Sequence, residues 1–301
     1  MKELADRRML LVHAHPDDET INNGATMAGY VADGVTVTLV TCTRGEHGEV
    51  LVPALEHHLA NRDNTLGDYR VGELKAAMEK LGVKDHLFLG DPDRRYCDSG
   101  MMGTPPNEDP RSFWKSDLME AAARLVEIIR DRKPQVLITY DEFGGYGHPD
   151  HIKAHQIAMK AAELAADPGF GSGEPWEIQK IYWSAIPRSA LQGSLTSSNP
   201  IIQVLIKLFN YAPSKWLAMP FVKADHLVTS KYEGDAFTDH KLAALRAHAT
   251  QLILDGDNFT FSKRLGIKIS GTEYYIRVKG DSAAPFDKDG RETDLFSAIT
   301  K

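Results

Sequence analysis

The chain has 301 residues, and at about 150 residues per domain this length suits one or two domains. It carries 35 Lys and Arg against 42 Asp and Glu, a net charge of −7, which argues against a nucleic-acid-binding protein because such domains are usually basic. Two cysteines, Cys42 and Cys97, exclude a disulfide scaffold and suit a reducing compartment. We see no signal peptide and no apolar run long enough to span a bilayer, so we expect a soluble cytoplasmic protein with no membrane partner.

Short apolar runs alternate with helical patterns through the first half of the chain. Runs bounded by Gly or Asp suit buried parallel strands, and they cover 9–12, 35–43, 86–89 and 136–140. Apolar residues at helical spacing predict helices over 20–32, 69–81, 117–130 and 149–166. This alternation predicts an α/β fold with a Rossmann-like, mostly parallel sheet and helices on both of its faces.

The second half is less regular. The pattern predicts a Gly- and Pro-rich loop over 167–175 and a polar excursion over 189–199. It also predicts strands over 178–185 and 274–278, and a helix over 235–251. We therefore expect an α/β core with the functional site over 1–170, and a smaller irregular portion over 171–301. That portion should pack on the same core and complete the pocket of that site, and a single domain is the alternative.

The segment richest in chemistry is His13-Ala14-His15-Pro16-Asp17-Asp18-Glu19, which places two imidazoles and three carboxylates where the first predicted strand stops. Ligands of open α/β sheets bind outside the carboxyl ends of the strands, so its position and its chemistry agree. A structural alternative exists, because an aspartate at a helix start is also an ordinary N-cap.

A second segment, Gly144-Gly145-Tyr146-Gly147-His148-Pro149-Asp150-His151, follows the fourth predicted strand. His148 and His151 are three residues apart at the start of a predicted helix, so they can share a face. Both His-Pro-Asp elements should open at the same edge of the sheet. We interpret them as two halves of one site.

Zinc is the metal that such a site suggests, because a catalytic zinc takes three ligands from His, Asp or Glu and keeps a position for water. One strand end offers His15 and Asp18, and the other offers His151. Asp17 is then a candidate base for the water, and His148 a candidate acid or oxyanion stabiliser. Iron(II) accepts the same ligand types, and the spacing alone does not choose the ligands.

With these two elements, the sequence resembles the zinc-dependent PIG-L/LmbE-like N-acetylglucosaminyl deacetylases, and its motifs are similar to those of the mycothiol branch. The resemblance begins with the two His-Pro-Asp elements and covers most of the chain. Further similar segments are Thr41–Glu49 (TCTRGEHGE), 69–74 (YRVGEL), 98–101 (DSGM), 247–251 (AHATQ) and 292–295 (ETDL).

The resemblance implies a role for each site residue. His15, Asp18 and His151 would bind zinc, and Asp17 would be the general base. His148 would be the acid or electrostatic stabiliser, Asp150 would orient it, and Tyr146 would polarise the acetyl carbonyl. Arg70 and Asp98 would bind sugar or inositol hydroxyls, Glu49 would line the pocket, and Met101 would also contact the substrate.

Two of the residues that the resemblance singles out have ordinary structural alternatives. Arg70 lies on a predicted helix and suits a surface salt bridge with Glu73 or Glu46. His248 is a lone helical histidine, for which a hydrogen-bonded buried position is the simpler interpretation.

Within the mycothiol branch, the family implies one of two activities. One removes acetyl from N-acetylglucosaminyl-inositol in mycothiol synthesis, and the other is an amidase that cleaves mycothiol S-conjugates. The deacetylase is the more similar of the two in three features of the sequence. These are the stretch 98–103, the glycine at position 147, and the absence of a lysine close after Glu19. Deacetylation of another N-acetylglucosaminyl substrate is a further alternative.

Two other classes of protein compete with a zinc hydrolase. A non-catalytic sugar-binding protein would not require the acid and base offered by Asp17 and His148. A nucleotide-sugar transferase is disfavoured because the first predicted strand leads into His-Pro-Asp-Asp, where a dinucleotide fold has Gly-x-Gly-x-x-Gly. We therefore expect a small glycoside as the partner, and the sequence does not predict the oligomeric state.

Overall fold

The structure is a computed structural model that describes residues 6–195, 220–255, 258–260 and 266–299. The strands of its central sheet are β1 (Arg8–His13), β2 (Thr36–Thr41), β3 (Asp85–Phe88), β4 (Val136–Thr139), β5 (Lys180–Pro187), β7 (Ser230–Glu233) and β11 (Thr272–Lys279). Strands β3, β2, β1, β4 and β5 lie side by side in this order and run parallel. β11 then pairs antiparallel with β5, and β7 antiparallel with β11.

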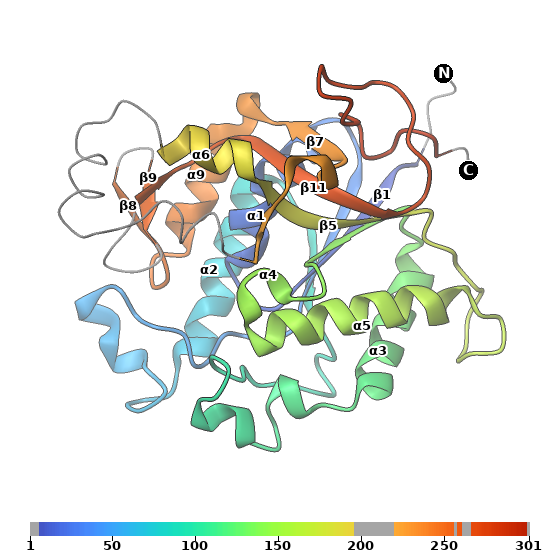
Figure 1. The fold of residues 1–301 in the computed structure, drawn as a ribbon. Coiled ribbons are helices and arrows are strands. Elements are labelled where there is room, and N and C mark those ends of the chain that lie inside the picture. The colour runs from blue at the N-terminus through green and yellow to red at the C-terminus, as the bar shows by residue number, and fades with distance from the viewer. Residues whose placement is uncertain (1–5, 196–219, 256–257, 261–265, 300–301) are drawn as a thin grey trace.

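Helices cover both faces of this sheet (Figure 1). They are α1 (Asp18–Ala32), α2 (Leu66–Leu81), α3 (Leu118–Arg132), α5 (Pro149–Ala166) and α9 (Thr238–Ala247). α3 and α5 pack against each other on one face, while α1, α2 and α9 pack together on the other. The predicted α/β fold with a mostly parallel sheet is therefore confirmed.

The apolar run at the start of the chain explains why the central strand is buried on both sides. Successive side chains of a strand point to opposite faces. Leu10 and Val12 belong to the core beneath α3 and α5, whereas Met9 and Leu11 belong to the core beneath α1 and α2. All four have 0% exposure, as expected for a parallel strand between two helical layers.

Shorter elements fill the connections. They are α4 (Gly144–Gly147), α6 (Arg188–Leu195), β6 (Val222–Lys223), and the 3₁₀ turns at Pro53–His58, Pro105–Glu108, Phe113–Lys115, Asp225–Leu227 and Asp235–Phe237. A small antiparallel sheet contains β8 (Ile253–Asp255), β9 (Asn258–Thr260) and β10 (Gly266–Lys268).

Much of the polar excursion predicted over 189–199 is helical, because α6 covers Arg188–Leu195. Residues 196–199 lie outside the described residues.

The portion after residue 170 extends the sheet of the first portion. β5, β11 and β7 all belong to it, and β5 pairs directly with β4. Tyr275, Leu295 and Phe296 pack in the same core as Met9 and Leu11. The two expected parts of the chain thus share one sheet and one core.

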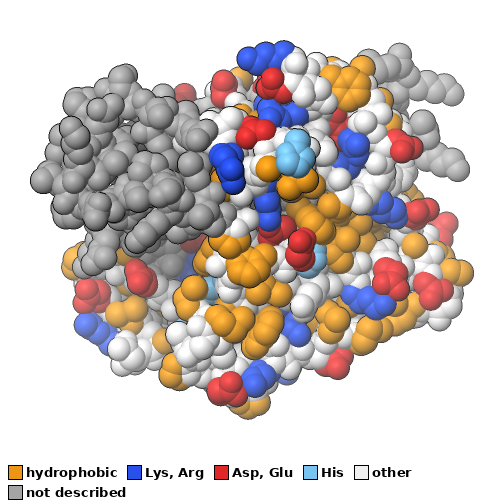
Figure 2. Space-filling model, viewed as in Figure 1, with side chains coloured by type: hydrophobic (Ala, Val, Ile, Leu, Met, Phe, Trp, Pro, Cys, Tyr) orange, Lys and Arg blue, Asp and Glu red, His pale blue; other side chains and the backbone are white. Residues whose placement is uncertain are grey.

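The described surface carries mixed charges. Figure 2 shows acidic and basic side chains interspersed over one face, with apolar side chains gathered near its middle. Within the described ranges, no helix has the length and apolar character needed to cross a bilayer.

Candidate active site and metal centre

The two His-Pro-Asp elements meet at the carboxyl edge of the sheet. One follows β1 and the other follows β4, and these strands are hydrogen-bonded neighbours. The ring centroid of His15 lies 4.7 Å from that of His148 and 5.3 Å from that of His151. The topology thus brings together two segments that are more than a hundred residues apart in sequence.

Local sequence explains how the second element reaches this position. His148 is the N-cap of α5, and Pro149 follows at the first helical position, where its missing N–H costs nothing. The preceding loop folds back on the helix at Gly144, which has φ +64°, and a Cβ there would lie 2.6 Å from the backbone nitrogen of Ile152. Only glycine therefore fits this close approach.

The imidazole of His15 divides the site into two sides. Its Nε2 faces the carboxylates of Asp150, at 3.1 Å, and Asp98, at 3.6 Å. Its Nδ1 faces Oδ2 of Asp18 at 3.4 Å. Burial alone would lower the pKa of His15, but Asp98, Asp150 and Asp18 raise it well above its usual value. A metal-binding histidine typically donates its other N–H to a carboxylate, so the Nδ1 side suits a metal.

The donors on the Nδ1 side of His15 fit a tetrahedral metal ion. Oδ2 of Asp18 lies 3.4 Å from both Nδ1 of His15 and Nε2 of His151. Ligands about 2.0–2.1 Å from a tetrahedral zinc are about 3.3 Å apart, so the distances from Asp18 to each of the two histidines suit a shared metal ion. Nε2 of His151 is buried without a hydrogen-bond partner, and its Nδ1 contacts the carbonyl of Gly144 at 3.2 Å. The side chain thus presents a lone pair to the space between the ligands.

Among the described residues, two triplets of metal-binding side chains have all their donor atoms within 4.8 Å of one another, and neither includes Asp18. His148 has a ring nitrogen within 4.8 Å of those of His15 and His151, and Asp98 and Asp150 form a similar group with His15. The second group lies on the Nε2 side of His15, where its carboxylates accept backbone N–H groups.

Asp18 is ionised in this environment: burial opposes its ionisation, but His151 and His15 hold its pKa well below the usual range.

Asp17 lies beside these donors in an unusual backbone conformation, with φ 118° and ψ −33°. Its Oδ2 is 3.4 Å from Nη2 of Arg70. Burial raises the pKa of Asp17 to about 6, while Arg70 opposes this shift. A carboxylate with a pKa close to neutral is suited to accept and return a proton.

His148 is neutral in this arrangement. Its Nδ1 accepts the backbone N–H of Asp150 at 3.2 Å, so its proton lies on Nε2. Burial, together with His15 and His151, lowers the pKa of His148 to about 2. A neutral imidazole of this tautomer donates a hydrogen bond but has no second proton to release.

Asp150 differs from its predicted part in the site. It was expected to orient His148, yet its Oδ2 contacts Nε2 of His15 and accepts the N–H of Ser99 at 2.9 Å. It meets His148 through its backbone N–H. The physical reason is the helix start: His148, as N-cap, accepts the backbone N–H of Asp150, and the side chain of Asp150 contacts His15 and Ser99 instead.

Arg70 and Asp98 are buried beneath the site. Arg70, with 3% exposure, donates to the carbonyls of Pro16 and Gly45, the latter at 3.0 Å. The interpretation of Arg70 as a surface salt bridge with Glu73 or Glu46 was therefore wrong. Asp98 accepts backbone N–H groups at 2.7 and 3.0 Å.

The other predicted site residues have exposed side chains. Tyr146 is 49% exposed and its ring centroid lies 4.9 Å from that of His151, while Met101 is 48% exposed. Glu49 has an exposed side chain, and its carbonyl accepts a hydrogen bond from Gln251 at 2.8 Å. Phe143, also exposed, directly precedes the α4 turn.

Sequence reasoning missed two residues that shape the site. Tyr140 stacks on His151 with centroids 4.3 Å apart, and its hydroxyl accepts the N–H of Ala14 at 2.8 Å. Asp141 accepts the N–H of Gly145 at 2.7 Å and pairs with Lys223 at 2.5 Å, which holds the Tyr146 loop. Their only signal in the sequence is a polar pair directly after an apolar strand.

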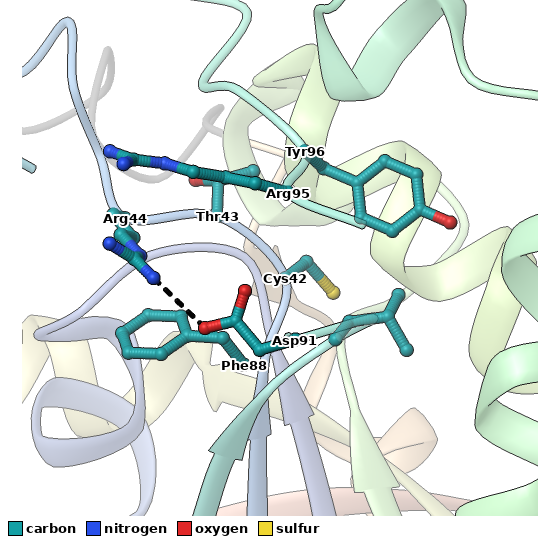
Figure 3. Close-up of a pocket in the computed structure, with 8 residues that line it drawn as sticks. Cys42, Thr43, Arg44, Phe88, Asp91, Arg95 and Tyr96 are labelled. Carbon is teal, nitrogen blue, oxygen red and sulfur yellow. Dashed lines mark hydrogen bonds and ion pairs between the residues drawn. The ribbon is translucent and has the colours of Figure 1, made fainter. Parts of the chain in front are cut away.

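A pocket beside the site opens at the ends of β2 and β3 (Figure 3). It is lined by Cys42, Thr43, Arg44, Phe88, Leu89, Asp91, Arg95 and Tyr96. Arg44 crosses it to Asp91 at 2.9 Å, as the dashed line in Figure 3 marks. Burial raises the pKa of the Cys42 thiol, so this side chain is not an activated nucleophile.

The sequence is similar to a protein-family model and to full-length proteins of the same description. Residues 10–162 match the family model described as PIG-L, GlcNAc-PI de-N-acetylase. A protein of Geodermatophilus obscurus described as 1D-myo-inositol 2-acetamido-2-deoxy-alpha-D-glucopyranoside deacetylase is 53% identical, over 97% of this chain and 98% of its own. One of Streptomyces avermitilis with the same description is 52% identical over 99% of both chains.

Solved structures share the fold at low sequence identity. The conserved protein TT1542 from Thermus thermophilus is 20% identical with a TM-score of 0.57, over 93% of this chain and 98% of its own. The N,N'-diacetylchitobiose deacetylase from Pyrococcus horikoshii is 18% identical with a TM-score of 0.58, over 92% and 85%.

Proposed function

Since this chain belongs to the PIG-L family of de-N-acetylases, we propose that it is a metal-dependent amide hydrolase that removes the N-acetyl group from N-acetylglucosaminyl-inositol. Full-length relatives at about half identity carry the description of that deacetylase. The product would be the free amine on glucosamine, which the family resemblance connects with mycothiol synthesis.

The observation that carries the proposal is the position of Asp18 between His15 and His151 at the carboxyl edge of the sheet. This arrangement supports a metal held by one carboxylate and two imidazoles, with Asp17 next to it. We take zinc as the metal, with iron(II) as the alternative, because both accept this ligand set. When bound there, zinc would lower the pKa of a water molecule to about 7 and polarise the acetyl carbonyl.

The chain's own residues would handle the protons and the developing charge. Asp17 would take a proton from the attacking water. The Nε2 proton of His148 would donate a hydrogen bond to the carbonyl oxygen as it becomes negative, with Tyr146 on the same side. Because neutral His148 has no second proton to release, the proton that Asp17 takes from water would pass to the leaving amine. Donation by His148 itself would require protonation at Nδ1 and loss of its bond to Asp150.

The predicted substrate-binding residues form an exposed group and a buried group. Glu49, Met101 and Tyr146 are exposed and can meet a glycoside directly. We propose that Arg70 and Asp98 contribute mainly from below, because their polar atoms already hold Asp17, His15 and nearby backbone. This is a change from their expected part as binders of sugar hydroxyls.

The test compares amine release from N-acetylglucosaminyl-inositol and from a mycothiol S-conjugate, with zinc-loaded and with chelated protein. We expect metal-dependent release mainly from the first substrate. Release mainly from the conjugate would instead assign the amidase activity. Zinc-loaded protein that releases amine from neither would contradict the proposal and redirect the search to other N-acetyl sugars.

A further inference from the structure

The backbone of Asp17 is held in a conformation that residues with a side chain rarely adopt. Its φ of 118° lies in the region that favours glycine, at the turn between β1 and α1. Such conformations persist only where the surroundings enforce them. The N–H of Asp17 donates to Oε2 of Glu19 at 2.9 Å, which is the bond that closes this turn.

Glu19 is itself fixed from the far end of the chain. It has 0% exposure, and its Oε1 accepts the hydroxyl of Thr20 at 2.6 Å and contacts Nε2 of His248 at 3.0 Å. His248 also has 0% exposure and directly follows α9. The ring thus supplies the partner that a buried carboxylate needs, and it comes from a segment 229 residues away.

The segment that carries His248 is anchored independently of the site. Thr250 donates to Glu73 on α2 through its N–H at 2.8 Å and its hydroxyl at 2.7 Å. Its carbonyl accepts the N–H of Leu51 at 2.8 Å. His248 therefore rests on a rigid support, and it can transmit that rigidity to Glu19.

We propose that Glu19 and His248 are positioning residues, which hold the turn at Asp17 so that its carboxylate stays aimed at the attacking water. Neither side chain reaches the substrate, because both are fully buried behind the turn. This inference rests on the proposed function of Asp17, and it adds a dependence of that function on the segment after α9.

The first experiment compares Glu19→Ala with a matched control, Glu273→Ala. Glu273 is also buried, accepts two N–H groups of α1 at 3.1 and 2.8 Å, and binds a cation of α9, Lys241, at 2.6 Å. It does not contact Asp17. We expect Glu19→Ala to lower kcat about 100-fold with KM and metal content unchanged, because a misplacement of about 1 Å costs this much. Glu273→Ala should lower kcat less than about 3-fold, and Glu19→Gln, which keeps an acceptor for the N–H, should recover most of the rate.

The second experiment is a double-mutant cycle with Asp17→Asn. If Glu19 acts through Asp17, adding Glu19→Ala to Asp17→Asn changes the residual kcat less than about 3-fold. Multiplicative losses would overturn the inference. His248→Asn tests the same contact from the side of α9, and it should also lower kcat at constant KM.

A crystal structure of Glu19→Ala, or of His248→Asn if the first variant does not fold, provides a readout independent of activity. We expect the φ of Asp17 to leave the positive region. An unchanged turn, or equal kcat losses in the Glu19 and Glu273 variants, would overturn the positioning role. An inactive wild-type protein would instead contradict the proposed function, and the backbone of Asp17 in the variant would still decide the positioning role.

Discussion

Glu292 forms the buried junction between the end of the chain and the central sheet, and we expect its removal to be strongly destabilising. It has 0% exposure. Its carboxylate receives hydrogen bonds from Lys180 at 2.8 Å, Tyr182 at 2.7 Å, Ser230 at 2.8 Å and Ser297 at 2.8 Å. Two strands of the sheet and the C-terminal segment therefore depend on one carboxylate.

The magnitude follows from what Glu292→Ala leaves behind. Lys180 is 1% exposed, so the substitution leaves a buried ammonium without its carboxylate. Removing one partner of a buried pair costs about 3–5 kcal/mol of unfolding free energy. Replacing both partners by apolar residues, as in Lys180→Met with Glu292→Leu, should recover part of this loss because the buried ammonium is removed. Arg277, which lies 3.0 Å from Glu292, also loses its partner, but its side chain is partly exposed to water.

Equilibrium urea unfolding, followed by circular dichroism, measures these differences. The control is Glu174→Ala, which removes the exposed ion pair with Lys133 and should leave the free energy of unfolding almost unchanged. A loss below about 1 kcal/mol for Glu292→Ala would refute the reasoning. A double variant less stable than Glu292→Ala would also refute it.

The difference in unfolding free energy between wild type and Glu292→Ala should depend on pH. Burial raises the pKa of Glu292, but Lys180, Tyr182 and Ser230 outweigh it and hold the pKa below its ordinary value of 4.5. The stabilisation by the carboxylate is therefore complete above that value and is lost as the pH falls through the lower folded-state pKa. The stability difference between wild type and Glu292→Ala should shrink as the pH is lowered below 4.5. Burial lowers the pKa of Lys180, and the positive charge of Arg277 adds to this effect, although Glu292 opposes it.

Three further predictions concern the site. Asp17→Asn should keep the metal, measured by atomic absorption, and lower kcat about 10²–10⁴-fold, the range for loss of a general base; normal turnover would show that the base is another residue. His148→Gln keeps an N–H donor, so it should retain more activity than His148→Ala if His148 stabilises the oxyanion, whereas equal losses would identify it as the proton donor. Chelation should lower the melting temperature of the wild-type protein, since a ligand at about 100 times its Kd stabilises by about 2.7 kcal/mol; the same shift in Asp18→Asn would contradict the assigned ligand set.

Local patterns were sufficient to predict the fold and the meeting of the two motifs. Met9–Val12 is apolar at every position, which indicates a strand buried on both faces. Strand order in such a sheet places the carboxyl ends of β1 and β4 together, so two His-Pro-Asp elements after strands are brought into one site. Both predictions need only short-range periodicity and the geometry of parallel sheets.

Contacts across the fold were beyond that reasoning. Whether Asp150 orients His148 or His15 depends on which way the first turn of α5 faces, and the sequence gives both histidines equal weight. Arg70 was misjudged because a charged helical residue is exposed by default, whereas here two backbone carbonyls and Asp17 compensate its burial.

The charge balance of the site explains why these buried contacts occur together. Carboxylates gather around the turn after β1, those of Asp17, Asp18, Glu19, Asp98 and Asp150. Arg70 supplies one permanent positive charge against them, and His248 pairs with Glu19. Burying so many carboxylates without compensation would be prohibitive, since each buried anion needs a partner. A divalent cation between Asp18 and the two imidazoles would offset much of the remaining negative charge and release the proton that the carboxylates otherwise hold on His15. The same excess of negative charge that makes the turn costly to fold therefore makes it a strong site for a metal ion.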